Sequence, residues 1–310
     1  MSPTSVRRRD LVLGALVADA AALGLHWLYD PAALAARAPA DAECAFLAPA
    51  PYPAGSGAFA HAGKRPGDPS PYGVHLRVLL EALCAADGAL DLADYQARFR
   101  AAFGYGGRFC GYIDKPTRGT LANLDAGRTT PSGVDDDQVC VLAKLPALLA
   151  ADLREAATLD AAVRVTHTAD VALAWCRFSA GLLAALVDGA TLADALAAAL
   201  AQAPAALATA ARQGLECTAA DPAAALGRAC PLAQAMPLAL HLLAHAPDFA
   251  GGVRANIRAG GDSCGRALLL GPALAALHGV GTPRGIPLAW LARLVDAPAL
   301  IALAETLAAR

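Results

Sequence analysis

The sequence predicts an all-α fold that forms a single domain. Hydrophobic residues make up 56% of the chain but aromatic residues only 5%, and much of the apolar content is alanine. Because alanine has the highest helix propensity and buries little area per residue, this composition favours many closely packed helices. No segment alternates apolar and polar residues with the period of a strand, and no internal repeat or polar linker divides the chain. We therefore expect residues 1–310 to form one compact many-helix domain.

The first third of the chain combines helical patterns with one long irregular segment. Asp10 is the expected cap of a first helix that ends near Trp27, and Asp30 and Pro31 supply the cap and first-turn proline of a short second helix. Residues 42–70 are rich in proline and glycine and lack periodicity, so they predict a loop, and loops of this length are usually functional. Further helices are expected over about 71–85 and 91–103.

The helical pattern resumes after two polar segments, at 104–107 and 111–120. Thr191 and Asp194 have the spacing of a capping box at the start of one later helix. The helices expected in the rest of the chain cover residues 135–151, 159–165, 168–187, 191–202, 204–213, 232–246, 248–258, 263–278 and 288–308.

Composition and charge argue against several classes of protein. Lys+Arg 25 against Asp+Glu 27 leaves a net charge of −2, without the basic excess that binds nucleic acid. The eight cysteines include no C-x-x-C pair, which favours buried free thiols in a cytoplasmic protein. No uninterrupted apolar run reaches the ~20 residues of a membrane span. Arg7–Arg9 before an apolar stretch would suit an export signal, but Asp19 interrupts that stretch. We expect a cytoplasmic location and neither a nucleic-acid nor a membrane partner.

Three adjacent carboxylates, Asp135, Asp136 and Asp137, precede an apolar helix and follow Ser132 and Gly133. A helix N-terminus stabilises acidic side chains, so an exposed acidic cap is the simplest explanation. However, a cap needs one carboxylate, whereas neighbouring carboxylates repel one another and together offer oxygen ligands to a hard cation. We therefore favour a functional site here over a simple cap.

A second cluster lies near the C-terminus, where Gly260 and Gly261 lead into Asp262 and Ser263. The glycines allow a turn and leave room for a ligand near the backbone. Arg266 follows Asp262 by one helical turn, so the two can pair. A capped helical hairpin explains the pattern; the alternative is a carboxylate at the helix start that holds a cation or a sugar hydroxyl.

Three smaller clusters complete the candidate site. Ser70, Tyr72 and Gly73 stand between the long loop and an apolar helix. His167 lies in a polar break between two helices, where a single histidine is more often structural than a ligand. His26 belongs to an aromatic segment at the end of the first helix, which can stack a flat ligand or belong to the core.

Taken in chain order, these blocks resemble the ADP-ribosylglycohydrolase superfamily, which includes dinitrogenase reductase-activating glycohydrolase. The segments that resemble its opening helix, its Thr-His motif and its C-terminal block are 14–24, Thr166-His167 and Gly260-Gly261-Asp262. The segments that resemble its J-type crystallin branch are Gly24–Asp30, Tyr72-Gly73, Lys115–Asn123 and Asp135–Gln138. The similarity covers nearly the whole chain.

The resemblance implies an all-α fold with a central cleft, two magnesium ions in that cleft, and hydrolysis of an N- or O-glycosidic bond to ADP-ribose. The implied partner is a small molecule or an ADP-ribosylated substrate. Metal ligands in active members come from a Thr-Asp-Asp block and a later Asp-x-Asp-Thr/Ser block. Here the matching blocks read Ser70-Pro71-Tyr72-Gly73 and Asp262-Ser263-Cys264-Gly265, so only one hydroxyl and one carboxylate remain. The resemblance therefore predicts an altered metal site.

The expected function is an ADP-ribosylglycohydrolase-like hydrolase for an ADP-ribosyl or related ribosyl substrate. The alternatives are an inactive ligand-binding or structural, crystallin-like protein and a different hydrolase for a small glycoside or amide. The predicted catalytic residues are Asp136, Asp137 and Asp262, and the predicted Mg²⁺ ligands are Asp135, Asp136, Asp262 and Ser70. The predicted substrate-binding residues are Ser70, Tyr72, Gly73, Ser132, Gly133, His167, Gly260, Gly261, Arg266 and His26. We expect loop 42–70 to act as a lid, with Arg118 and Arg266 available to a diphosphate.

Overall fold

The computed structural model describes residues 1–310 as helices joined by loops, without a strand. The α-helices are α1 (Pro3–Ala22), α2 (Pro31–Arg37), α3 (Pro71–Ala85), α4 (Leu92–Phe103), α5 (Lys115–Asp125), α6 (Leu145–Ala150), α7 (Ala156–Val163), α8 (Asp170–Val187), α9 (Leu192–Gln202), α10 (Ala205–Leu215), α11 (Pro222–Leu226), α12 (Leu232–Ala244), α13 (Phe249–Arg258), α14 (Ser263–His278), α15 (Leu288–Leu291) and α16 (Ala297–Ala308). Two 3-10 helices, η1 (Leu23–Leu25) and η2 (Val139–Lys144), complete the helical elements. The prediction of an all-α fold is confirmed.

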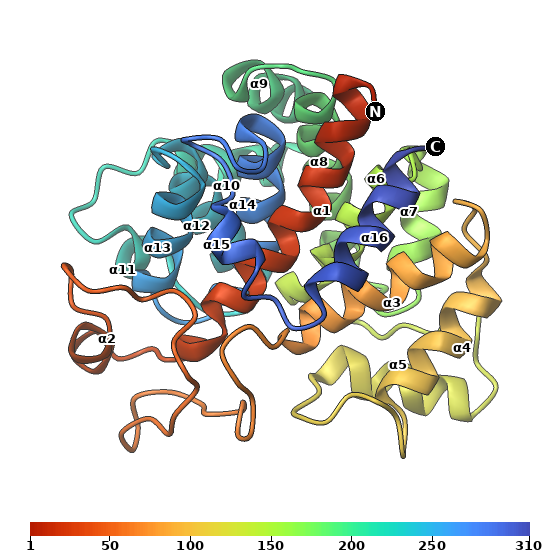
Figure 1. Ribbon diagram of the computed structural model, residues 1–310, viewed down its shortest axis with the longest axis horizontal. Coiled ribbons are helices and arrows are strands. Elements are labelled where there is room, and N and C mark those ends of the chain that lie inside the picture. The colour runs from red at the N-terminus through yellow and green to blue at the C-terminus, as the bar shows by residue number, and fades with distance from the viewer.

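Helices α1 and α14 form the centre of the molecule. Figure 1 shows α1 crossing the middle of the fold with α14 beside it and α16 between α1 and α3. Every residue from Asp10 to Ala22 in α1 and from Ser263 to Ala276 in α14 is buried. One hydrophobic core of 86 residues surrounds this pair, as expected of a single domain.

Two glycines let α1 and α14 pack backbone against backbone. A Cβ atom on Gly14 would lie 2.4 Å from the carbonyl oxygen of Gly271, and a Cβ atom on Gly271 would lie 2.4 Å from that of Gly14. Both distances are far shorter than a van der Waals contact, so neither position has room for a side chain.

The first helix begins earlier than predicted. It starts at Pro3 with Ser2 as its cap, because a capping side chain followed by proline suits the first turn of a helix. Asp10 lies inside the helix, where it is buried and pairs with Arg9, so the prediction that Asp10 caps it is wrong. The helix also ends before Trp27, because η1 follows α1 directly.

Two helices were not expected from the sequence. Helix α5 begins within the segment 111–120 that we expected to be irregular and continues to Asp125, and α11 is a single short turn. Only Pro116, Thr117 and Thr120 are buried in α5, so the apolar periodicity that predicts a helix is almost absent from it.

Two expected helices are shorter or divided. The segment 135–151 becomes helical only at Val139, first as η2 and then as α6, so the three carboxylates lie in a loop. The segment 288–308 is divided into α15 and α16, and Asp296, which precedes α16, has a positive φ of 63°. Capping agrees better with prediction, since Asp30 caps α2 and Thr191 caps α9.

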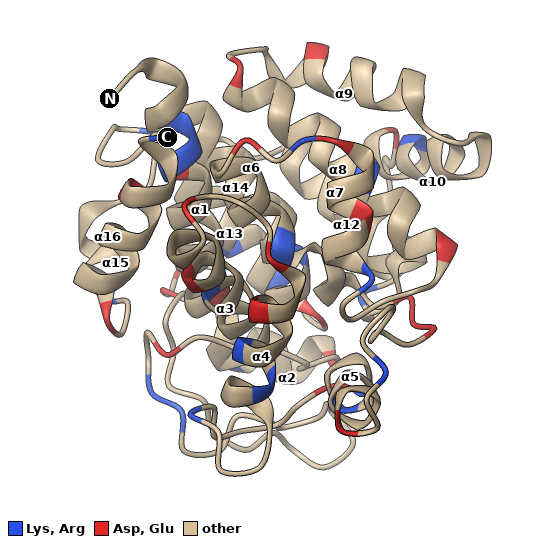
Figure 2. Cartoon of the chain, turned by 90° about the vertical axis from the view of Figure 1, so that its right-hand side faces the viewer, with Lys and Arg blue, Asp and Glu red and all other residues tan.

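Helix α8 is the one helix that is long and apolar enough to cross a membrane by length and composition. Inside the fold, 61% of it is buried, as in the core helix of a globular protein. Figure 2 shows acidic and basic residues interspersed over the chain in that view, in keeping with a net charge of −2.

Candidate active site

Four buried polar atoms without a hydrogen-bond partner mark the candidate active site. Of ten such side-chain atoms in the chain, these four are Trp27 Nε1, the Tyr72 hydroxyl, Asp114 Oδ2 and Asp262 Oδ2. None of the four residues is more than 7% exposed. Because buried polar groups are nearly always paired, a cluster of four unpaired groups is a place where a ligand or ordered water can bind. We call these four residues the polar centre.

The polar centre gathers around Tyr72. Burial raises the pKa of Tyr72 well above its usual range, and the nearby charges of Asp262 and Asp114 raise it further. The thiol of Cys230 lies close to both Asp262 and Trp27, so Trp27 belongs to the same cluster as Asp262 and Tyr72. The four side chains come from the residues just after η1, the first turn of α3, and the caps of α5 and α14.

Asp262 is held by a histidine pair. Its Oδ1 accepts hydrogen bonds from His26 Nε2, at 2.9 Å, and from the backbone N–H of Gly265, at 2.8 Å, as the cap of α14. Burial opposes ionisation, but the bond and charge of His26 outweigh it, so the pKa of Asp262 is lowered. His26 Nδ1 lies 2.9 Å from Nε2 of His61, which belongs to loop 42–70. The loop therefore reaches the carboxylate through two imidazole rings.

Asp114 has the opposite electrostatic character. Its Oδ1 accepts the backbone N–H of Thr117 at 2.9 Å as the cap of α5, while Oδ2 has no partner. Burial raises the pKa of Asp114, and the hydrogen bonds to Thr117 offset this only in part. Two carboxyl groups of one site with pKa values moved in opposite directions are the arrangement that separates a proton donor from an ionised carboxylate.

Only the middle carboxylate of the acidic triplet is buried. Asp136 pairs through Oδ2 with Lys115 Nζ at 3.1 Å, and its Oδ1 lies 3.7 Å from His167 Nε2. Asp135 and Asp137 are exposed. The structure therefore brings Asp136 and His167 together but turns the other two carboxylates to solvent.

Ser70 and Gly73 build the start of α3. The Ser70 hydroxyl donates to the buried carboxylate of Asp19, its backbone N–H donates to Asp19 Oδ2 at 2.9 Å, and its Oγ accepts the N–H of Tyr72. A Cβ atom on Gly73 would lie 2.3 Å from Asp19 Oδ2, so this position needs glycine. Ser70 is thus engaged within the fold, and Asp19 supports the segment that carries Tyr72.

Gly260, Gly261 and Arg266 support the backbone around Asp262. Gly261 has a φ of 64°, and its carbonyl accepts the N–H of Trp27 at 2.8 Å. Arg266 is fully buried and binds Asn256 and three backbone carbonyls, so the predicted pairing with Asp262 does not form. Its guanidinium N–H groups are directed into the fold.

Ser132 and Gly133 lie beside the segment that carries His167. Ser132 Oγ donates to the carbonyl of Val165 at 2.8 Å, and Gly133 N–H donates to that of Arg164 at 2.9 Å. A Cβ atom on Gly133 would lie 2.6 Å from the backbone nitrogen of His167. Both residues therefore position His167.

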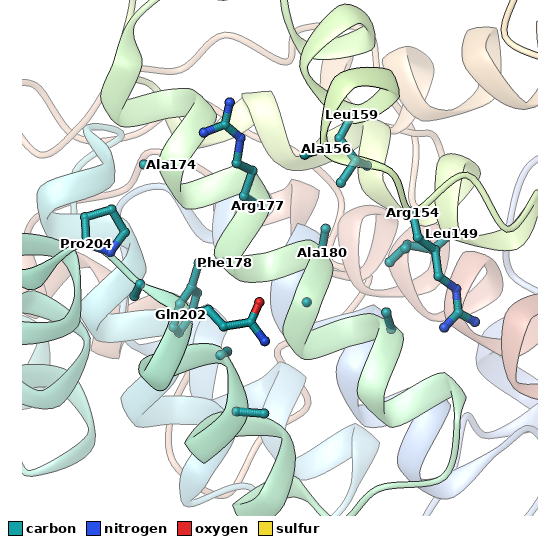
Figure 3. A pocket seen from close by; sticks show the side chains of 15 residues that line it. Leu149, Arg154, Ala156, Leu159, Ala174, Arg177, Phe178, Ala180, Gln202 and Pro204 are labelled. Carbon is teal, nitrogen blue, oxygen red and sulfur yellow. The ribbon is translucent and has the colours of Figure 1, made fainter.

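A separate pocket of about 380 Å³ lies between α8 and α9 (Figure 3). Its walls are mostly apolar, and its charged residues are Arg154 and Arg177. Arg154 pairs with Asp188 at 2.6 Å, and Arg177 donates to Asp160 at 2.9 Å. With both cations paired and no member of the polar centre in its lining, this pocket offers no acid–base group.

The fold and the sequence of this chain are similar to those of one known family. A solved structure called "ADP-ribosylglycohydrolase-related protein complex" superposes with a TM-score of 0.76 at 22% identity, covering 100% of this chain and 99% of that one. No curated protein sequence is matched. The family model for ADP-ribosylglycohydrolase matches residues 2–310. The chain belongs to the ADP-ribosylglycohydrolase family.

Membership of the ADP-ribosylglycohydrolase family supports a glycohydrolase-like function. The comparisons do not single out the J-type crystallin branch, which stays a prediction.

The residues around Asp262 do not fit the two-magnesium centre that the resemblance to the family implies. Tyr72 and Cys264 occupy positions where the family motif places carboxylates, and the Cys264 thiol donates to the carbonyl of Asp19 at 3.5 Å. No three His, Cys, Asp or Glu side chains are grouped so that they could hold a metal. Of the predicted ligands, Asp135 is exposed to solvent and Asp136 pairs with Lys115. Asp262 accepts a hydrogen bond from His26, and Ser70 donates one to Asp19. Since Mg²⁺ prefers several oxygen ligands in octahedral geometry, this donor set is a poor match.

Sequence reasoning missed Asp114 and Trp27 as site residues. Asp114 precedes Lys115-Pro116, a cap and first-turn proline that signal a helix start, but the polar segment hid the helix. Trp27 has a positive φ of 65°, which is rare for a residue with a large side chain and often marks a functional site. Sequence alone carries no signal for that backbone conformation.

Proposed function

We propose that this protein hydrolyses a glycosidic bond to the ribosyl unit of ADP-ribose or a related substrate, using two buried carboxyl groups rather than the family's metal pair. The observation that carries the proposal is the polar centre, in which Asp114 and Asp262 each present a free oxygen. Glycoside hydrolysis needs one protonated carboxylic acid and one ionised carboxylate on either side of the bond.

We assign the two roles from the direction in which burial and hydrogen bonds move each pKa. Asp114, whose pKa is raised, donates a proton to the departing oxygen or nitrogen as the bond to the anomeric carbon breaks. Asp262, whose pKa is lowered, stabilises the positive charge on the sugar and accepts a proton from the attacking water. Trp27 N–H and the Tyr72 hydroxyl then pair with oxygens of the sugar.

Helix α5 carries groups suited to the rest of the substrate. Asp114 at its start is buried, whereas Lys115 and Arg118 on its first turn are exposed. Arg118 also stacks on Tyr112, which packs edge-on against Trp27. A ribosyl unit at the polar centre would therefore leave a phosphate near cations.

The test is hydrolysis of arginine-linked and serine-linked ADP-ribosyl peptides, with free ADP-ribose quantified by mass spectrometry, in EDTA and in Mg²⁺. We expect turnover in EDTA, reduced at least ~100-fold in Asp114→Asn and in Asp262→Asn. Asparagine caps helices as well as aspartate does, so both variants keep their helix starts. Asp135→Asn, at an exposed position, is the matched control and should keep full activity.

The alternative is a binding or structural protein, and the replacement of family metal ligands by Tyr72 and Cys264 favours it. Calorimetric binding of ADP-ribose without turnover of any substrate would support this alternative. Turnover that disappears in EDTA and returns with Mg²⁺ would contradict the metal-free part of the proposal.

A further inference from the structure

A buried lysine without a carboxylate partner lies behind His167. Lys144, at the end of η2, is fully buried, and the only hydrogen-bond partner of its Nζ is the Thr166 hydroxyl, at 2.6 Å. Burying an ammonium group without a counter-ion is unfavourable, and burial lowers the pKa of Lys144. The one hydrogen bond that this buried lysine makes is therefore of interest for function.

The Thr166 hydroxyl also contacts a second residue, His167. Thr166 Oγ1 lies 2.8 Å from His167 Nδ1, so Lys144, Thr166 and His167 form one hydrogen-bonded chain. At its far end, His167 Nε2 lies 3.7 Å from Asp136 Oδ1 and 3.6 Å from Cys140 Sγ. The side chains of this hydrogen-bonded series, and those of Asp136 and Cys140 at its end, are all buried.

The position of each proton follows from the lysine end. The Lys144 ammonium can only donate, so the Thr166 oxygen accepts from it. The Thr166 hydroxyl then donates to its other partner, His167 Nδ1, so Nδ1 carries the lone pair. Burial lowers the pKa of His167 well below its usual value, so the ring is neutral and its one proton is on Nε2.

We infer that Lys144 is a positioning residue, which acts through Thr166 to hold His167 in the Nε2–H tautomer with that N–H directed at Asp136 and Cys140. In this tautomer the His167 N–H faces the Cys140 sulfur, so the ring is not a base for the Cys140 thiol. An electrostatic effect of the same N–H on Asp136, 3.7 Å away at the edge of the polar centre, rests on the proposed function. The tautomer itself does not.

Long-range ¹H–¹⁵N correlation spectra of the ¹⁵N-labelled full chain test this inference. They report which ring nitrogen is protonated in each of the seven histidines, and His167→Asn assigns the signal. We expect the Nε2–H pattern in the unmodified chain and in Thr166→Ser, which keeps the hydroxyl. Thr166→Val and Lys144→Met should lose the single-tautomer pattern. Lys115→Met, which removes a lysine from the other oxygen of Asp136, is the matched control and should keep it.

An Nδ1–H pattern in the unmodified chain would overturn the inference, and so would unchanged patterns in both Thr166→Val and Lys144→Met. The spectrum of the unmodified chain is decisive by itself if those variants do not fold. If the tautomer is as expected but no ADP-ribosyl substrate is hydrolysed, the proposed function fails and the positioning role stands.

Discussion

Asp19 shows how a single buried carboxyl group couples the stability of the fold to pH. Burial raises its pKa to about 6, and the hydrogen bonds from Ser70 offset this only in part. Because the folded pKa exceeds the unfolded one, the folded state favours the protonated acid. This contribution to stability is complete below the unfolded pKa and is lost as the pH rises through about 6.

We therefore expect Asp19 to lower the free energy of unfolding by up to about 3 kcal/mol between pH ~4 and ~7, since each pKa unit corresponds to ~1.4 kcal/mol. Asp19→Asn mimics the protonated acid, because its amide can donate to Ser70 Oγ and accept the Ser70 N–H. Urea unfolding at a series of pH values should show a flatter pH dependence for the variant. Parallel curves for the two proteins would remove Asp19 as the cause.

The contact between α1 and α14 depends on glycine, which makes helix packing testable. Gly14→Ala and Gly271→Ala each place a methyl group 2.4 Å from a backbone oxygen of the other helix. We expect each substitution to destabilise the fold by about 1–3 kcal/mol or more, because a backbone cannot move aside as a side chain can.

Gly181→Ala is the matched control for these two variants. It lies within α8, and a Cβ atom there would have no neighbour within 4 Å. Alanine should therefore stabilise the fold by about 0.5–1 kcal/mol through helix propensity alone. Chemical denaturation of all three variants gives the comparison, and equal effects at the three positions would contradict the packing argument.

Helix prediction succeeded where caps and apolar periodicity agree and failed where one was missing. Helices α3, α9 and α14 have a capping side chain followed by an apolar face, and each was expected within a residue or two. Helix α5 has the cap but only three buried residues, so its pattern resembled a loop.

The molecule as a whole should respond differently to nucleotide and to metal. If the polar centre binds ADP-ribose, the ligand at 100 times its Kd stabilises the fold by ~2.7 kcal/mol, which thermal unfolding detects. Mg²⁺ alone should leave the melting temperature unchanged, because no group of three His, Cys, Asp or Glu side chains is placed to hold it. A rise with Mg²⁺ alone, lost in Asp262→Asn, would show that a metal site is present after all.

The sequence by itself determined the fold class, most of the helices and the family, because helix propensity, capping and motif order are local properties of the chain. It also pointed to Asp262, His26 and Tyr72 as site residues, and the structure brings these three side chains together. Only the tertiary structure decided what those residues do, because a carboxyl group's charge depends on its burial and partners. Asp262 meets His26 across 236 positions of sequence, and Asp114 became a site residue only through packing.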